Sequence, residues 1–224
     1  MYARYAVFFT PDGPFAEFGA AWLGWDSALG RAVPHPVVPG READIVAWTA
    51  RPRRYGFHAT LKAPFRLAER AGQGELIRAV EAFGARMPAV EAGPLALSDA
   101  GGFLALRPVE QPRALTDLAA AAVRDLDGFR APLSEADIAR RREVALTPEQ
   151  DAQLLEWGYP FVFDDFHFHM TLSGPLADPA PVAAVLEPLL AGVVPDVLRI
   201  ATVTLMGEDR EGLFHQVATV PLSG

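Results

Sequence analysis

Two strand-like segments, 111 residues apart, repeat the same pattern, and this repeat sets the strongest constraint on the fold. FHATLKAPF at 57–65 and FHMTLSGPL at 168–176 share five of nine residues at matching positions. Both are rich in β-forming residues, and both carry a histidine followed two residues later by a threonine. Accidental repeats consist mostly of apolar core residues, whereas this one is centred on polar residues. We therefore expect two equivalent strands.

Side chains on a β-strand alternate between its two faces, which predicts what each segment presents. On the first strand the polar face is predicted to carry His58, Thr60 and Lys62. On the second strand it is predicted to carry His167, His169, Thr171 and Ser173. The opposite faces are apolar and suit a core. If the two strands lie side by side across a groove, two imidazoles and two hydroxyls converge there.

The rest of the chain alternates between helical and strand patterns. Strands are expected over 3–10, 54–65, 90–99, 102–109, 166–176, 197–209 and 212–222. Helices are expected over 14–30, 43–50, 75–87, 113–129, 134–142, 147–159 and 179–192, with Pro188 ending or kinking the last one. Ser134 and Thr147 are predicted N-caps, the second in a capping box with Gln150. Because several strands neighbour each other as hairpins, an α+β fold is favoured over a doubly wound parallel sheet.

Composition narrows the classes of function. The net charge of −8 argues against binding long nucleic acid, yet allows a small anionic ligand in a locally basic pocket. The absence of cysteine excludes disulfides and thiolate chemistry. We expect neither a signal peptide nor a membrane span, and hence a cytoplasmic protein without a membrane partner, most simply a monomer.

The paired histidines and threonines point to acid–base chemistry at phosphorus. Two imidazoles titrate near neutral pH, so one can act as base while the other acts as acid. Threonine hydroxyls donate hydrogen bonds to phosphate oxygens. Displacement at phosphorus needs a base on the attacking oxygen and an acid on the leaving oxygen, which two histidines supply without a metal. The alternative without chemistry is a pair of structural histidines. A metal site is disfavoured, because the sequence lacks the spacing of a metal-ligand set.

The motifs His58-Ala-Thr60 and His169-Met-Thr171 resemble those of the 2H phosphoesterase superfamily, which is named for two H-x-T/S motifs. Within it the chain is most similar to the DUF1045 group, which is associated with phosphonate metabolism. The likeness rests on RYGFHATLKAPF at 54–65, FHFHMTLSGPL at 166–176 and the overall length.

The resemblance implies a single bilobal α+β domain over 1–224 with pseudo-twofold symmetry, in which two antiparallel sheets flank a central groove and the helices lie outside. It also implies metal-independent hydrolysis or ligation of cyclic phosphodiesters without a cofactor. His58 and His169 would be catalytic, and Thr60 and Thr171 would bind the phosphate of the substrate.

Other polar residues are weaker candidates for substrate contacts. They are Lys62, Tyr55, Ser173, His167 and Arg54. Arg51, Arg53 and Arg54 form a basic stretch before the first motif that either meets substrate or lies in water. Arg140–Arg142 belong to a segment, 130–165, that is expected to be either a helical lid supplying cations or a solvated helix.

We predict a metal-independent phosphodiesterase that opens a small cyclic phosphodiester, such as a cyclic phosphoribosyl ester of phosphonate metabolism. Pseudo-symmetry leaves open which histidine is the base. One alternative is an RNA-end enzyme, a phosphodiesterase or ligase acting on 2′,3′-cyclic phosphate. Another is a non-catalytic protein that binds a nucleotide or phosphate ester.

Overall fold

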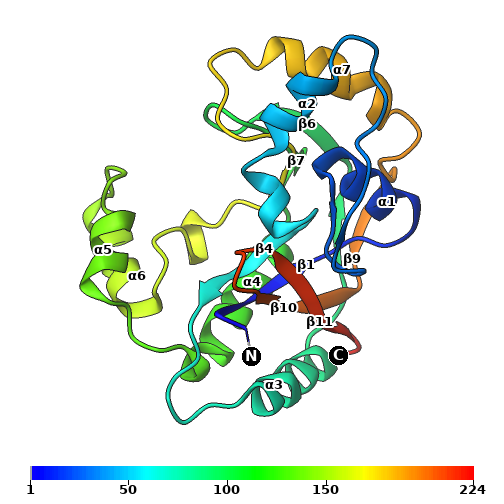
Figure 1. The fold of residues 1–224 in the computed structure, drawn as a ribbon. Helices are drawn as coiled ribbons and strands as arrows, with labels where there is room; N and C mark the ends of the chain where they lie inside the picture. The colour runs from blue at the N-terminus through cyan, green and yellow to red at the C-terminus, as the bar shows by residue number, and fades with distance from the viewer. Residues whose placement is uncertain (1) are drawn as a thin grey trace.

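The computed structural model describes residues 2–224, and within them a seven-stranded antiparallel sheet contains both motif strands (Figure 1). The sheet order is β11-β10-β1-β4-β8-β7-β6. Its strands are β1 (Arg4–Phe9), β4 (Ala59–Phe65), β6 (Leu95–Asp99), β7 (Leu104–Pro108), β8 (Met170–Thr171), β10 (Thr202–Glu208) and β11 (Phe214–Pro221). Two short ribbons accompany it, β2 (Trp25–Asp26) with β3 (Arg31–Ala32), and β5 (Val90–Gly93) with β9 (Leu198–Ile200).

The sheet has two halves that meet where β4 pairs with β8. The pairing there consists of Ala59 opposite Met170, with four strands on one side and three on the other. Every strand pair among the described residues is antiparallel. The α+β prediction is therefore confirmed, and the two expected sheets are continuous through this one residue pair.

Helices cover the sheet and extend beyond it (Figure 1). They are α1 (Gly13–Leu23), α2 (Glu42–Thr49), α3 (Gln73–Arg86), α4 (Arg113–Asp125), α5 (Glu135–Arg141), α6 (Pro148–Trp157) and α7 (Ala180–Leu190). Helices α5 and α6 stand beside the sheet rather than on its main core, and the predicted caps Ser134 and Thr147 begin them. Whether the segment 130–165 acts as a lid stays a prediction.

Strand β1 divides the interior into a large and a small apolar cluster. Tyr5, Val7 and Phe9 face the main core, which holds most buried residues of the protein. Ala6 and Phe8 face the other way, into a small cluster with Met206 and Phe214 that Tyr55 partly covers. This second cluster is relevant to the first motif because its Phe8 ring stacks on His58.

Three sequence predictions need correction. The strand expected over 166–176 is reduced to β8, because residues 166–169 have no regular ladder partner and are held by side chains instead. The segment 90–99 divides at Gly93 and Pro94, so that β5 pairs with β9 and only β6 forms the expected hairpin with β7. Helix α7 continues past Pro188 to Leu190.

Candidate active site

The β4–β8 register brings the two motifs side by side. In an antiparallel pair, the residues before and after Ala59 lie opposite those after and before Met170. His58 is thus opposite Thr171, and Thr60 is opposite His169. The structure brings the four residues together, with each histidine facing the threonine of the other motif.

Both imidazole rings are anchored in the same way. Nδ1 of His58 donates to the carbonyl of Gly56 at 2.9 Å, and Nδ1 of His169 donates to the carbonyl of His167 at 2.8 Å. A carbonyl oxygen only accepts, so Nδ1 carries the hydrogen in both rings. The neutral Nε2 therefore holds a lone pair, as a general base requires. Each histidine lies immediately before a strand, and the backbone carbonyl two residues earlier accepts the hydrogen bond from its ring.

His58 lies in a largely aromatic environment. Its ring stacks on Phe8 with 3.8 Å between centroids, and the Tyr55 ring is 5.8 Å away. The Thr60 hydroxyl lies 3.2 Å from Nε2 of His58. The pKa of His58 is lowered to about 4. Burial is the largest cause, the hydrogen bond to Gly56 opposes it, and the charge of His169 adds to the lowering. A pKa this low favours the neutral form of the His58 ring near neutral pH.

The pKa of His169 is also lowered, by burial and by a neighbouring cation. Burial lowers its pKa, the hydrogen bond to His167 opposes this, and the positive charge of Arg107 lowers it again. The Phe103 ring meets the imidazole edge-on with 5.8 Å between centroids. The two histidines therefore share a depressed pKa but differ in neighbours, aromatic for His58 and cationic for His169.

Arg107 is a site residue that sequence reasoning missed. Leu106 pairs with Met170, which places Arg107 opposite His169 on the adjacent strand β7. Arg107 forms no ion pair with any residue of 2–224. It is free to contact an anion beside the second motif. The GFLALRPV strand was predicted, yet nothing in the sequence indicates that it pairs with that motif.

A hollow of about 260 Å³ opens beside the two motif strands. Thr60, His167, His169 and Arg107 are among its polar lining residues. Its aromatic lining includes Phe103, Tyr159, Phe161, Phe163 and Phe166. This groove is large enough for a small ester, and Asp165 also lines it.

Gln111 holds the segment that leads to His169. Its Nε2 donates to the carbonyl of Phe166 at 3.0 Å, and its Oε1 accepts from the backbone nitrogen of Phe168 at 2.7 Å. One amide side chain thus satisfies the backbone on both sides of His167, where no strand partner lies. Gln111 is a positioning residue for the second motif.

Two predicted candidates for substrate contacts are engaged in the interior. Nζ of Lys62 is buried and donates to the Val123 carbonyl and to Asp127 Oδ1, both at 3.0 Å. The pairing of β1 with β4 shifts register between Thr60 and Lys62, so the predicted alternation of faces does not extend to Lys62. Ser173 is buried too, where its Oγ accepts from the Leu104 nitrogen and donates to the Gly174 carbonyl.

The remaining candidates lie at the edges of the site. Tyr55 stacks on Phe214 with 5.1 Å between centroids, next to His58. His167 is exposed and lines the groove. Arg54 is exposed and turns away, donating to the Gly212 carbonyl at 3.3 Å and lying 3.7 Å from Glu208.

The basic stretches also have definite positions. Arg51 is exposed and Arg53 is half-buried in the turn before the first motif. On α5, Arg140 binds Asp137, while Arg142 binds Asp151 at the start of α6. Arg141 lies over the Tyr159 ring at 4.9 Å, beside the groove.

The depressed pKa of His58 predicts a pH dependence of folding. Its folded pKa of about 4 lies below the ordinary value of 6.5, so the unfolded chain binds the proton more tightly. The stability contribution is complete above pH 6.5 and is lost as the pH falls toward 4, up to about 3 kcal/mol. NMR titration of the His58 ring should give a midpoint near 4. A midpoint near 6.5 would contradict the burial argument.

Two further structural observations concern metal binding and membrane-spanning helices. Within residues 2–224, no group of three or more His, Cys, Asp or Glu side chains is arranged to hold a metal ion. In the same residues, no helix has the length and apolar content that crossing a bilayer requires.

The structure thus shows an antiparallel α+β fold that carries two His-x-Thr motifs on neighbouring strands. The family model of DUF1045, described as a protein of unknown function, matches residues 60–215. The chain belongs to the DUF1045 family, which confirms the resemblance drawn from the motifs.

Two curated relatives are similar over much of the chain. Ribose 1,5-bisphosphate phosphokinase PhnN of Janthinobacterium sp. (strain Marseille) is 36% identical over 231 residues, covering 99% of this chain and 51% of that protein. The protein of the same name from Laribacter hongkongensis (strain HLHK9) is 39% identical over 176 residues, covering 77% and 40%. The chain thus spans about half the length, or less, of these relatives. Among solved structures, E. coli LigT complexed with NADP+ is 15% identical with a TM-score of 0.46, covering 100% of this chain and 99% of that one.

Proposed function

We propose that the chain is a phosphodiesterase that opens a small cyclic phosphodiester, with His58 and His169 as the acid–base pair. The observation that carries the proposal is the symmetric anchoring of the two rings on neighbouring strands. Each Nδ1 donates to the carbonyl two residues earlier, so each Nε2 carries a lone pair, and Nε2 of His58 lies 3.2 Å from the Thr60 hydroxyl. An imidazole fixed in one tautomer and orientation supports proton transfer at a defined atom.

The proposed step transfers two protons. One neutral imidazole takes a proton from the attacking water as its oxygen bonds to phosphorus. The other, as imidazolium, gives its proton to the ester oxygen as the bond from that oxygen to phosphorus breaks. Exchange with solvent then restores the pair. Both pKa values are depressed in the free protein, so the negative charge of the bound phosphate is what favours the protonated form of one ring.

Three further side chains support binding of the phosphate. Thr60 and Thr171 are half-buried and supply hydroxyl donors next to the rings. Arg107 supplies a cation opposite His169, and among residues 2–224 no carboxylate forms an ion pair with it. Positioned cations and donors that meet a developing charge commonly contribute the largest share of catalysis.

A cyclic phosphoribosyl ester is the proposed substrate. Adding water to a ribose 1,2-cyclic phosphate that bears a 5-phosphate, with O2 leaving, gives ribose 1,5-bisphosphate. That compound appears in the names of the two curated relatives, which are about twice as long as this chain or longer. A domain that makes a compound is a sensible neighbour for one that phosphorylates it.

The test is hydrolysis with and without EDTA. We expect turnover of the 5-phosphorylated ribose 1,2-cyclic phosphate, unchanged by EDTA, and slower turnover of 2′,3′-cyclic mononucleotides. A faster reaction with 2′,3′-cyclic ends would favour RNA-end processing. Ligand binding with no turnover of either ester would favour a non-catalytic binding protein and overturn the proposal.

A further inference from the structure

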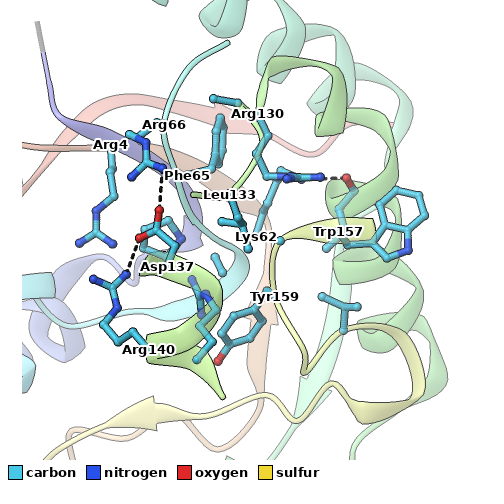
Figure 2. Close-up of a pocket in the computed structure, with 17 residues that line it drawn as sticks. Arg4, Lys62, Phe65, Arg66, Arg130, Leu133, Asp137, Arg140, Trp157 and Tyr159 are labelled. Carbon is cyan, nitrogen blue, oxygen red and sulfur yellow. Dashed lines mark hydrogen bonds and ion pairs between the residues drawn. The ribbon is translucent and has the colours of Figure 1, made fainter. Parts of the chain in front are cut away.

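A second hollow adjoins the groove beside the two motifs, and five of its 17 lining residues are arginines (Figure 2). The two hollows share four lining residues, Ala63, Val123, Tyr159 and Val162. We name this second hollow the arginine pocket. Its cationic lining residues are Arg4, Lys62, Arg66, Arg130, Arg140 and Arg141. The arginine pocket and the groove are therefore direct neighbours that share one wall.

The cationic side chains of the arginine pocket outnumber the carboxylates that pair with them. Figure 2 shows Asp137 between Arg66 and Arg140, and this one carboxylate binds both at 2.6 and 2.9 Å. Lys62 and Arg130 share Asp127, and Arg4 binds Glu208. Six cations thus meet three carboxylates, in a chain whose net charge is −8. The surplus marks a place where an anion is favoured.

Arg141 is the cation without a partner. It forms no ion pair within residues 2–224, and its Nε is buried without a hydrogen-bond partner there. Its guanidinium lies 4.9 Å from the centre of the Tyr159 ring, on the wall that both hollows share. A buried donor without a hydrogen-bond partner costs free energy. A ligand that accepts a hydrogen bond from Arg141 would remove this cost.

The arginine pocket lies at a useful distance from the histidines. Arg4 and Phe8 share one face of β1, and Phe8 stacks on His58. The Tyr55 ring lies next to His58, with 5.8 Å between the ring centroids. Four residues of strand span roughly 13 Å. This separation, less the reach of the arginine side chains, matches a sugar that carries a phosphate at each end.

We propose that the arginine pocket binds the terminal, non-reacting phosphate of a sugar cyclic phosphate while His58 and His169 act on the cyclic ester. The inference rests on the proposed function and deepens it, because it assigns a separate site to the second phosphate. Guanidinium groups match phosphate oxygens in a bidentate fashion. Asp137 keeps Arg66 and Arg140 oriented but cannot neutralise both. The pocket therefore selects a substrate with two phosphates over one with a single cyclic phosphate.

The test compares ribose 1,2-cyclic phosphate with and without a 5-phosphate. We expect the wild-type kcat/KM to be higher for the 5-phosphorylated ester, and R141Q to reduce the ratio of the two values by about 10- to 100-fold. R142Q is the matched control, since Arg142 follows Arg141 but binds Asp151 outside the pocket. R140Q is a second variant in case R141Q does not fold, because its side chain is 60% exposed.

Each outcome decides between the two proposals. Equal wild-type kcat/KM for both esters, or an unchanged ratio in R141Q and R140Q, would overturn the pocket and leave the phosphodiesterase standing. If neither ester is hydrolysed, calorimetry with ribose 5-phosphate tests the pocket by itself. Wild-type binding that weakens in R141Q but not in R142Q supports it, and binding that is absent or unchanged in R141Q overturns it.

Discussion

Replacing either His58 or His169 with alanine is expected to lower kcat for hydrolysis of the cyclic ester by about 10²–10⁴-fold. The reason is that, in the proposed mechanism, each ring carries one of the two proton transfers, and a backbone carbonyl fixes the tautomer of each ring. The double variant should lose far less than the product of the two single effects, because the pair acts as a unit. Steady-state kinetics with EDTA present measures all three.

His215 provides the matched control for these variants. It is a half-buried histidine that binds Asp209 at 2.7 Å and lies outside the histidine groove. H215A should keep kcat close to the wild-type value. Circular dichroism of each variant checks the fold. Hydrolysis that survives in a folded H58A/H169A double variant would rule out the two-histidine mechanism.

The largest effect on stability is expected from Asp127. Its carboxylate accepts from buried Lys62 and, in bidentate fashion, from Arg130. Burial opposes its ionisation, yet the hydrogen bond from Arg130 and the charge of Lys62 keep the pKa of Asp127 below its usual range. D127A leaves the Lys62 ammonium buried without a counter-charge, and removing one partner of a buried pair costs about 3–5 kcal/mol in the free energy of unfolding.

Asp125 is the surface counterpart two residues earlier. It pairs with Arg86, with side chains 39% and 59% exposed, so D125A should cost at most about 1 kcal/mol. Adding K62M to D127A removes the unpaired ammonium and should recover part of the loss. Urea unfolding of the four proteins, wild type included, gives the comparison. Equal effects of D127A and D125A would contradict the role assigned to the buried pair.

Much of the site could be predicted because its signal is repeated in the sequence. The repeat of His58-x-Thr60 at His169-x-Thr171 predicts two equivalent strands with one polar face. The α+β class followed from hairpin-like neighbours. These features depend on short-range patterns, which a sequence displays directly.

Other parts of the site depend on pairing between distant segments, which local patterns do not encode. Arg107 reaches His169 only because β7 happens to be the strand beside β8. Gln111 takes the place of a missing strand partner for residues 166–168, and no pattern in the sequence around it predicts this role. Lys62 was assigned to the polar face by strict alternation, but the register shift before it moves its ammonium to Asp127. Each difference comes from one tertiary contact that overrides a sound local rule.

The single Ala59–Met170 pair between the two half-sheets has a mechanical consequence. A broad ladder resists bending because many hydrogen bonds must deform together, whereas a joint one residue pair wide has little stiffness. Each imidazole is fastened to its own half by a ring–carbonyl bond, so orientation is set locally while the gap between the rings is set by the joint. The flexibility of the backbone ladder between the two half-sheets is therefore concentrated at one point, in the middle of the two motifs, while the shared apolar core packs across that point.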